Sequence, residues 1–400
     1  MNEAVGRNGK FWRPPMWKWG VFAALVVCSA VLFLRKPTAE PVKVELLPFT
    51  DSPPVWDGAY PYLVVSSTAD SNVGGGGAAS VKFKSSISLV KPTLRHDSAV
   101  NEFAVDLHTG RFLLRQTDIF VSDVMPLSLT RTYRVWDAYS RAFGAGSNHP
   151  YDICPTGTRF PYTYMDLNLE DGRQVYFSRI SKGTGYADAV FRHDRTSSEF
   201  YAAQIAWNGN GWTLKSRNGQ QVIFPEAYYA KNYAQGAPVE IRDGEGHHIQ
   251  LKRDGGRNLQ QLVSPSGHTI TFKYDDLGRI VEAEDGAGQI RKYSYAYEHL
   301  KSVGDGAHVL YEFEYRILLK PAAGYDPYLM TSIRDGSGKE LLRNWYANGR
   351  VSKQKFGDGK IYGYDYLFNR KNEIVETRVT LPGGEEKRVF FEGGVMVKEK

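Results

Sequence analysis

The chain has 400 residues, of which 42% are hydrophobic and 24% charged, which is enough material for one or two well-buried domains. The formal net charge of +6 is modest for this length, so we expect no nucleic-acid partner, because such partners usually require a dense basic surface. The two cysteines, Cys28 and Cys154, exclude a disulfide framework and a zinc site of the CxxC type.

An apolar segment without charged residues runs from Trp19 to Leu34. As a helix its sixteen residues would span roughly 24 Å, and the flanking Trp and basic side chains suit a membrane interface. Residues 1–18 contain four basic residues and one acidic residue, which predicts a cytoplasmic N-terminus. We therefore expect a transmembrane signal-anchor over 19–34 and an extracytoplasmic bulk in a single-pass membrane protein. The alternative is a cleaved signal peptide and a secreted protein.

Residues 35–80 are rich in proline and then in glycine, with four consecutive glycines at 74–77. This composition buries too little apolar surface to fold alone, and it gives extended and then flexible spacing. We expect a tether here, with a short strand around Tyr62 to Val65.

Residues 81–235 have the composition of β-structure and are expected to form a β-rich opening domain. Strand-like stretches lie at 119–122 and 127–133. Two hairpins are indicated by the turn signals Asp171-Gly172 and Asn218-Gly219, each of which separates two alternating stretches.

Residues 236–400 contain glycines that recur at intervals of 21 residues, namely Gly246, Gly267 and Gly288, and again Gly338 and Gly359. A fixed period of this kind is typical of a repeat array. The interval from Gly288 to Gly338 holds eight residues more than two periods, and we expect them in a surface loop between Leu319 and Leu329.

The clearest copy of the repeat begins at Gly267, with an alternating stretch from Thr269 to Tyr274 and a second stretch from Ile280 to Glu284. Asp-Gly steps punctuate the series and would supply the positive φ angles of tight turns. Each unit therefore predicts strand, turn, strand and turn. The expected fold is all-β, with antiparallel hairpin repeats forming a curled sheet behind one N-terminal transmembrane helix.

Two further features recur within the units. An aromatic residue follows the anchoring glycine by seven positions, except where Arg253 replaces it in the first copy; the aromatic residues are Tyr274, Tyr295, Trp345 and Tyr366. In two copies a glycine is followed by Arg and a β-branched residue, as Gly278-Arg279-Ile280 and Gly349-Arg350-Val351.

The run Tyr274-Asp275-x-x-Gly278-Arg279-Ile280 resembles the repeat of the RHS (rearrangement hotspot) or YD-repeat family. A second stretch, 105–137, resembles the domain of unknown function that opens many RHS cores. Its matching residues are Val105, Asp106, Thr109 and Gly110, then Pro126, Leu127, Leu129, Arg131 and Tyr133. The resemblance covers about residues 98 to 400 and implies a partial β-shell. The family's terminal cleavage motif does not match at Asp326-Pro327, so we expect a short form without that motif or a toxin domain.

The residues that could suggest catalysis or metal binding are better explained by roles in turns and strands. The pair Asp106-x-His108 would share a strand face, but a turn before Thr109-Gly110 is favoured. The adjacent His247 and His248 would point to opposite faces of a strand, which prevents easy chelation. The acids Asp275, Asp276 and Asp365 are read as turn or surface residues rather than calcium ligands. We expect no catalytic residue, no metal and no cofactor.

The sequence therefore predicts a non-enzymatic, membrane-anchored RHS-type protein of the cell envelope that binds or scaffolds, related to the toxin-carrying RHS effectors. Its partners would be the membrane and a protein or glycan. One alternative is a carbohydrate-binding module that uses aromatics such as Tyr295 and Trp345, although cross-strand packing explains the same residues. A second alternative is a glycan-acting or self-cleaving enzyme, which would need paired carboxylates in a cleft.

Overall fold

The computed structural model describes residues 62–67, 85–90, 101–134, 140–195, 200–230, 233–317, 328–392 and 395–399, all of which belong to one unit, Val44–Lys400. The predicted cytoplasmic segment and the membrane anchor at 19–34 lie outside these residues and stay predictions. Within the described ranges, no helix has the length and apolar character needed to cross a membrane.

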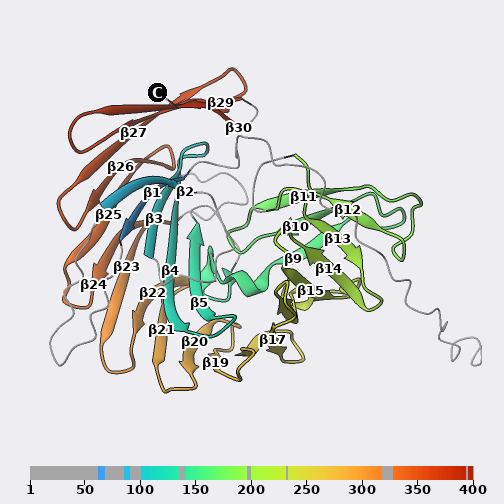
Figure 1. Ribbon diagram of the computed structural model, residues 1–400. Helices are drawn as coiled ribbons and strands as arrows, with labels where there is room; N and C mark the ends of the chain where they lie inside the picture. Colours follow the sequence, from blue (N-terminus) through green and yellow to red (C-terminus); the bar gives the residue numbers. More distant parts are fainter. Residues whose placement is uncertain are drawn as a thin grey trace, which may run out of the picture. The chain divides into compact units, whose positions relative to one another are not determined.

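The first part of the described chain forms an antiparallel sheet, here called the opening sheet (Figure 1). Its strand order is β2-β1-β3-β4-β5-β8, with β1 (Tyr62–Ser67), β2 (Ser85–Val90), β3 (Asn101–Asp106), β4 (Arg111–Val121), β5 (Leu127–Arg134) and β8 (Ser147–Asn148). A separate short pair is formed by β6 (Ser140–Arg141) and β7 (Gly144–Ala145), and a 3-10 turn, η1 (Pro150–Asp152), follows. One strand of this sheet, β1, falls within the segment predicted as a tether, at the position where a short strand was expected.

The rest of the described chain forms one long series of antiparallel strands, here called the ladder, in which each strand pairs with the next. Its first part comprises β9 (Cys154–Gly157), β10 (Tyr164–Asn168), β11 (Gln174–Arg179), β12 (Val190–Arg192), β13 (Gln204–Trp207), β14 (Gly211–Lys215), β15 (Gln221–Pro225), the 3-10 turn η2 (Tyr233–Gly236), β16 (Glu240–Arg242), β17 (His248–Arg253), β18 (Leu259–Val263) and β19 (Thr269–Tyr274). It continues through β20 (Ile280–Asp285), β21 (Ile290–Ala296), β22 (His299–Gly304), β23 (Val309–Ile317), β24 (Tyr328–Asp335), β25 (Glu340–Ala347), β26 (Arg350–Phe356), β27 (Ile361–Phe368), β28 (Ile374–Thr380), β29 (Glu386–Glu392) and β30 (Val395–Glu399).

The prediction of an all-β protein with antiparallel hairpins is confirmed for the described residues. The expected boundary at 235–236 falls inside the ladder, between β15 and β16. The eight additional residues were expected in a surface loop between Leu319 and Leu329. Most of that stretch lies in 318–327, outside the described residues, and its last residues begin β24.

The turn chemistry differs in one respect from the expectation. In the turn Asp285-Gly286-Ala287-Gly288, positive φ belongs to Gly288 at +87°, and Gly286 is not among the positive-φ glycines. The Asp285 carboxylate closes this turn by accepting hydrogen bonds from the backbone N–H groups of Ala287 and Gln289, at 2.9 and 2.8 Å. The 21-residue spacing of glycines therefore follows the one turn position that requires a left-handed backbone.

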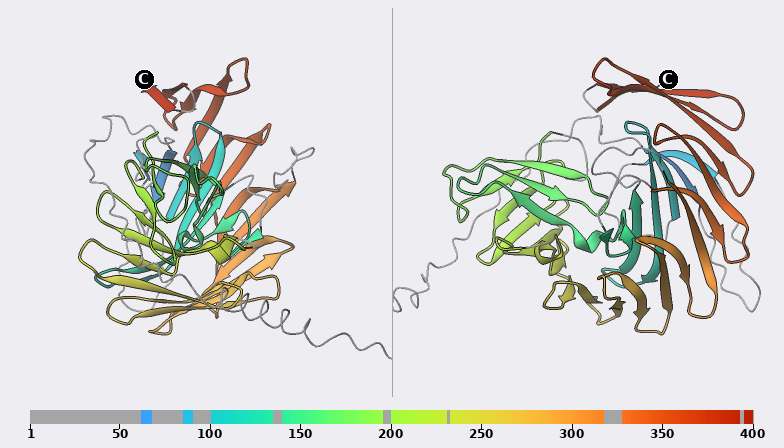
Figure 2. Two further views of the ribbon diagram at one scale, coloured as in Figure 1. Left: turned by 90° about the vertical axis from the view of Figure 1, so that its right-hand side faces the viewer. Right: turned by 180° about the vertical axis from the view of Figure 1, so that it is seen from behind.

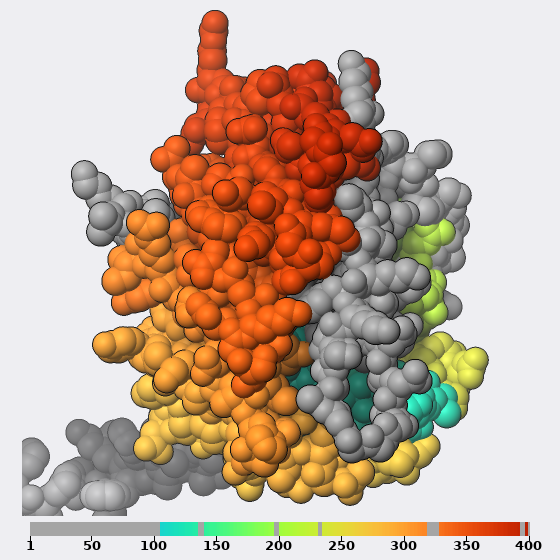
Figure 3. All heavy atoms as spheres, turned by 90° about the vertical axis from the view of Figure 1, so that its left-hand side faces the viewer, coloured from blue at the N-terminus to red at the C-terminus, as the bar shows by residue number. Residues whose placement is uncertain are grey.

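The hydrophobic core lies between the opening sheet and one face of the ladder. Strand β4 contacts β20 and β26, and β5 contacts β19, and the buried apolar side chains of both sheets form one cluster. Figures 1 and 2 show β3 to β5 beside the strands of the ladder's second half. In the space-filling view, the colours pass from yellow to red up the ladder, so its hairpins are stacked in chain order (Figure 3).

Candidate functional site

A repeated hydrogen bond joins neighbouring hairpins of the ladder. At the end of a strand, a tyrosine hydroxyl donates to the backbone carbonyl of a residue 15 or 16 positions earlier, in the preceding hairpin. The pairs are Tyr274 to Leu259 (2.7 Å), Tyr295 to Ile280 (2.5 Å), Tyr315 to Leu300 (2.9 Å), Tyr346 to Met330 (2.6 Å) and Tyr366 to Val351 (2.7 Å). We call these residues the clasp tyrosines. Burial raises the pKa of the Tyr274 and Tyr295 hydroxyls, so both remain donors at neutral pH.

Three of the predicted repeat aromatics are clasp tyrosines, but the fourth is displaced by one residue. In that copy the clasp is made by Tyr346, whereas Trp345 is 37% exposed and has the Lys353 ammonium 4.4 Å from its ring centroid. The register shift of the sheet falls directly before the clasp tyrosine here, between Trp345 and Tyr346, as it does before Tyr274 and Tyr295. The residue after the bulge therefore makes the clasp, and in this copy it lies eight positions after the glycine instead of seven. Tyr315 was missed because its unit does not keep the 21-residue interval.

The arginine of the repeat motif makes the opposite connection, towards the following hairpin. Arg279 donates from Nη1 to the backbone carbonyl of Tyr297 at 2.6 Å, and its guanidinium lies 4.2 Å from the ring centroid of Tyr295. Asp275 holds Arg279 in place through its Oδ2 atom, at 2.8 Å from Nε, while its Oδ1 atom accepts the backbone N–H of Leu277. The motif therefore links three successive hairpins, and Asp275 serves the turn.

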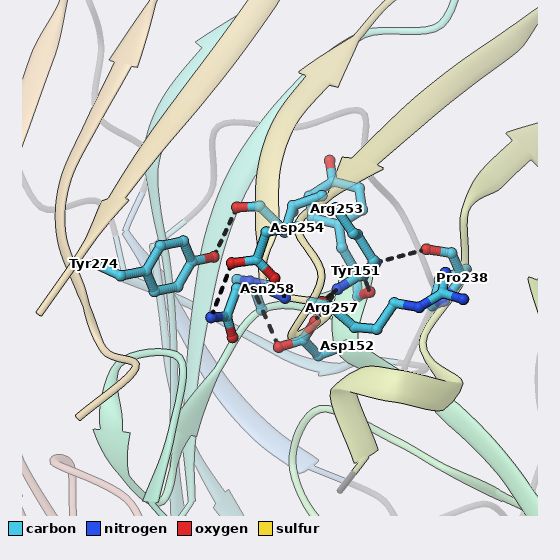
Figure 4. Close-up of polar contacts among 10 residues, drawn as sticks. Tyr151, Asp152, Pro238, Arg253, Asp254, Arg257, Asn258 and Tyr274 are labelled. Atoms are coloured by element: carbon cyan, nitrogen blue, oxygen red, sulfur yellow. Dashed lines mark hydrogen bonds and ion pairs between the residues drawn. The ribbon is translucent and has the colours of Figure 1, made fainter. Parts of the chain in front are cut away.

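Arg253, the exception in the sequence pattern, occupies the clasp position of its unit (Figure 4). Its Nε atom donates to the carbonyl of Pro238 at 2.9 Å, again 15 residues earlier. Its Nη1 atom also bonds to Asp152 Oδ1 at 3.0 Å, and its Nη2 atom donates to the carbonyl of Tyr151. A tyrosine cannot make these additional bonds, so the arginine both closes the repeat and joins the ladder to η1.

A buried histidine lies at the same junction. The His149 side chain is fully buried, and Nε2 is 3.7 Å from Asp152 Oδ2. Among the described residues, neither of its ring nitrogens has a hydrogen-bond partner. Burial lowers the pKa of His149, so the imidazole is neutral near pH 7. Burial opposes ionisation of Asp152, but His149 and Arg253 outweigh it and lower the pKa of that carboxyl.

The chain before β9, here called the opening region, is also joined to the ladder by backbone hydrogen bonds. We call this set of contacts the seam. The N–H of Ile280 donates to the carbonyl of Ala142 at 2.7 Å, and the N–H of Val351 donates to the carbonyl of Gly110 at 2.9 Å. The carbonyls of Ile280 and Val351 accept the clasp tyrosines of the next hairpin. The two β-branched residues that follow Gly-Arg in the sequence are therefore bonded on both sides.

Within the core, the opening sheet contributes a buried ion pair. Arg131 Nε and Asp118 Oδ2 are 2.5 Å apart, both side chains are 2% exposed, and Tyr293 of β21 donates to the same carboxylate at 2.9 Å. The rings of Phe143 and Phe313 lie 5.9 and 5.4 Å from the Arg131 guanidinium. Arg131, one of the residues on which the sequence resemblance rests, thus lies at the centre of the contact between the opening sheet and the ladder.

Asp106 and His108, which were considered as a catalytic pair, lie in different elements of the structure. Asp106 is the last residue of β3 and His108 lies in the turn that follows, so they do not share a strand face. Asp106 Oδ1 accepts the backbone N–H groups of His108 and Thr109, and Oδ2 pairs with Arg134 at 3.1 Å. The carboxylate is engaged in the turn and in a buried ion pair.

One group of potential metal ligands was not found from the sequence. Oxygen and nitrogen atoms of Asp243, Glu245 and His247 in the β16–β17 turn lie within 4.8 Å of one another. The Asp243 carboxylate is already hydrogen-bonded to His247 Nδ1 at 2.8 Å, and it accepts the backbone N–H of Glu245. The short Asp-x-Glu-x-His pattern is the sequence signal that would have pointed to this group, because carboxylate and imidazole groups are ligands of divalent cations.

Comparison with known families gives one match: residues 104–177 match the Domain of unknown function (DUF6531). The match covers β4, β5 and the first ladder strands, including Arg131 and Asp118. It is consistent with the RHS-related resemblance of this part, whereas the 21-residue repeats lie outside it. No curated protein sequence matches the chain.

Among solved structures, the chain is similar to the crystal structure of TcdB2-TccC3-Cdc42, with 12% identity and a TM-score of 0.29 over 74% of this chain and 20% of that chain. It is also similar to the Photorhabdus luminescens Tc holotoxin pore, with 9% identity and a TM-score of 0.21 over 72% of this chain and 22% of that one. A porin-like protein from Bacteroides uniformis shows 10% identity and a TM-score of 0.18 over 73% of this chain and 93% of that chain. The chain thus spans about a fifth of the two toxin-complex chains.

Proposed function

We propose that this chain is a non-enzymatic RHS-type scaffold, anchored in a membrane by residues 19–34, whose curled ladder is presented outside the cytoplasm for a protein or glycan partner. The observation that carries this proposal is the seam. Backbone bonds from Ile280 and Val351 fix the ladder to the opening region at two separate hairpins. A surface held at several points along its length is suited to presenting a fixed shape.

The use of the polar core supports a structural role. Asp106 pairs with Arg134, and Asp118 pairs with Arg131, both inside the core. Buried charges that pair with each other specify an arrangement of strands, whereas a catalytic carboxylate has to meet a substrate. Tyr295 is likewise engaged, because its hydroxyl makes a clasp hydrogen bond, whereas a sugar-binding role would require this aromatic side chain to be accessible to a ligand.

The anchor can be tested on the full chain by alkaline carbonate extraction of membranes. The full chain should stay in the membrane pellet, and a variant without residues 1–36 should be released. Release of the intact full chain would overturn the anchor, and an N-terminally trimmed soluble product would replace the anchor by a signal peptide. The non-enzymatic role predicts that purified full-length protein keeps its intact mass on prolonged incubation, whereas a defined internal cleavage would support a self-processing enzyme.

A further inference from the structure

Loops of the ladder's first part, together with the end of β13, carry a continuous series of aromatic side chains. Successive ring centroids are 4.6, 6.1, 5.8, 6.1 and 4.9 Å apart. The members, in spatial order, are Tyr229, Tyr228, Phe160, Tyr162, Tyr186 and Trp207, and we call this set the aromatic row. None of these residues takes part in the clasps or the seam.

The aromatic row is largely open to solvent. Tyr229 is 87% exposed and Phe160 is 74% exposed, while Tyr228 and Tyr186 are each 44% exposed. Single exposed apolar side chains are common, but a contiguous group of large aromatic ones marks a binding surface. Tyr162, which is 5% exposed, contacts both Phe160 and Tyr186 and so joins the two exposed parts of the row.

The row is built on a loop that the surrounding residues hold in place. Phe160 has φ of +51°, a backbone conformation that is costly for a bulky residue and that persists only where neighbours enforce it. At the base of this loop, Thr158 Oγ1 accepts the backbone N–H of Thr163 at 2.8 Å. Arg159 pairs with Glu226 at 3.2 Å, which ties the loop to the one that carries Tyr228 and Tyr229. The exposed Phe160 ring is therefore presented from a loop that its neighbours hold in one conformation.

Neighbouring rings of the row are steeply inclined to one another. The planes of Tyr228 and Tyr229 are at 84°, those of Phe160 and Tyr228 at 74°, and those of Tyr186 and Trp207 at 73°. Nearly perpendicular neighbours present ring edges and ring faces in alternation. Exposed aromatic side chains are the groups that line the binding surfaces for extended proline-rich peptides.

The chain itself contains such a peptide. Residues 44–61 read VELLPFTDSPPVWDGAYP, with prolines at 48, 53, 54 and 61, three acidic residues and no basic residue. The segment lies outside the described residues and ends immediately before β1. At about 3.1 Å per residue in the polyproline II form, it could reach over roughly 55 Å. The row's loops carry Arg159, which pairs with Glu226 and lies 4.6 Å from the ring centroid of Tyr228, and the exposed Lys182. The length of the segment and its end beside β1, rather than charge, therefore favour this peptide.

We propose that the aromatic row binds the proline-rich segment 44–61 of the same chain. Linkage to β1 gives the segment a high effective concentration at the row, so that weak contacts suffice. The row lies on loops of β9 to β15, apart from the seam, so this inference goes beyond the proposed scaffold and does not depend on the membrane anchor.

The test uses the full-length chain in mild detergent and measures hydrogen–deuterium exchange in the loops 158–163 and 226–230. Replacing Pro48, Pro53, Pro54 and Pro61 by alanine should speed exchange in both loops by about tenfold, the factor equivalent to 1.4 kcal/mol. Because the changes lie outside the described sheets, exchange in β19 to β26 should stay the same. Equal loop exchange in both proteins would overturn the proposal.

A reciprocal measurement follows the segment itself. Chymotrypsin should cleave after Phe49 and Trp56 slowly in the unmodified chain, and about tenfold faster in the double variant Phe160→Asn/Tyr229→Asn. Asparagine tolerates the positive φ at position 160, so the loop can keep its conformation. The matched control is Tyr297→Asn, an exposed tyrosine with positive φ outside the row, which should leave cleavage unchanged.

Three outcomes would overturn the assignment in distinguishable ways. Cleavage rates that are equal in the unmodified chain and the row variant mean that the segment is not bound there. Loop protection that falls on dilution of the protein would assign the peptide to a second copy. Loop protection that is indifferent to the proline changes but rises with added peptidoglycan oligosaccharide would assign the row to a glycan. The scaffold would stand in each case, because it is tested by membrane extraction and intact mass.

Discussion

Arg253 and Tyr274 make the same hydrogen bond one repeat apart. Arg253 Nε donates to the carbonyl of Pro238 at 2.9 Å, and the Tyr274 hydroxyl donates to the carbonyl of Leu259 at 2.7 Å, each to a residue 15 positions earlier. The arginine additionally holds Asp152, so the first clasp of the 21-residue series is also its attachment to the opening region.

Replacing Arg253 should therefore separate the contribution of the clasp hydrogen bond from that of the ion pair with Asp152. Arg253→Ala removes a clasp and leaves the Asp152 carboxylate without its cation, which should lower the free energy of unfolding by about 3–5 kcal/mol. Arg253→Tyr can restore the bond to Pro238 but not the ion pair, so its loss should be smaller. Urea unfolding followed by near-ultraviolet circular dichroism measures both. Equal losses in the two variants would mean that the clasp at this position contributes nothing.

The clasp tyrosines should each stabilise the ladder through the hydroxyl alone. Tyr295→Phe keeps the ring but leaves the carbonyl of Ile280 without the hydroxyl donor, which should cost about 1–2 kcal/mol in unfolding free energy. Tyr366→Phe should cost a similar amount. Tyr297→Phe, at a 90% exposed position, is the matched control and should be neutral in the same unfolding measurement. A neutral Tyr295→Phe would show that the aromatic ring alone explains the repeat residue.

The local part of the fold could be predicted from the sequence because it depends on short-range chemistry. The stretch from Thr269 to Tyr274 was expected as a strand and is β19, and the second stretch beginning at Ile280 is β20, which extends one residue further, to Asp285. Alternation and turn residues determine such hairpins. Hairpin repeats also predict antiparallel pairing of successive strands.

The connections between distant parts could not be predicted in the same way. The backbone N–H of Val351 bonds to Gly110 across more than two hundred residues, and a backbone bond leaves no mark in residue type. The aromatic row joins the loops of Phe160, Tyr186 and Tyr228, whose proximity depends on the order and twist of several strands. The Arg253 exception was visible in the sequence, but its meaning required the position of Asp152.

Gly110 offers a direct test of the seam. A Cβ atom added there would lie 2.8 Å from Cβ and Cγ of Arg350, and the residue has φ of +71°. Gly267 has φ of +87°, but an added Cβ would meet nothing within 4 Å. Gly267→Ala should therefore cost only the left-handed backbone penalty of about 1–2 kcal/mol, and Gly110→Ala should cost clearly more in the same unfolding experiment.

A larger loss for Gly110→Ala should be accompanied by faster hydrogen exchange at the backbone N–H of Val351, since that group bonds to the Gly110 carbonyl. Equal losses in the two alanine variants, with unchanged exchange at Val351, would show that the opening region and β26 can move apart without cost.

The buried His149 predicts how stability changes with pH. Burial lowers its pKa below the usual value of 6.5, so between the folded and unfolded values the unfolded chain binds a proton that the folded chain does not. Stability should therefore be retained above about pH 6.5 and should decline as the pH falls below it. The slope contributed by one histidine is at most about 1.4 kcal/mol per pH unit. Asp152, whose carboxyl pKa is also lowered, adds its loss only below its usual value of 3.8.

Unfolding free energies measured between pH 7 and pH 4.5 should therefore fall less steeply in His149→Leu than in the unmodified chain. His108, whose pKa burial also lowers, should keep its own slope in both proteins. The control His268→Gln changes an exposed histidine and should retain the full slope. If His149→Leu and the unmodified chain lose stability in parallel, the folded protein binds a proton at His149 as readily as the unfolded chain does. The imidazolium would then pair with Asp152, and the distance of 3.7 Å between Nε2 and Oδ2 would have to shorten.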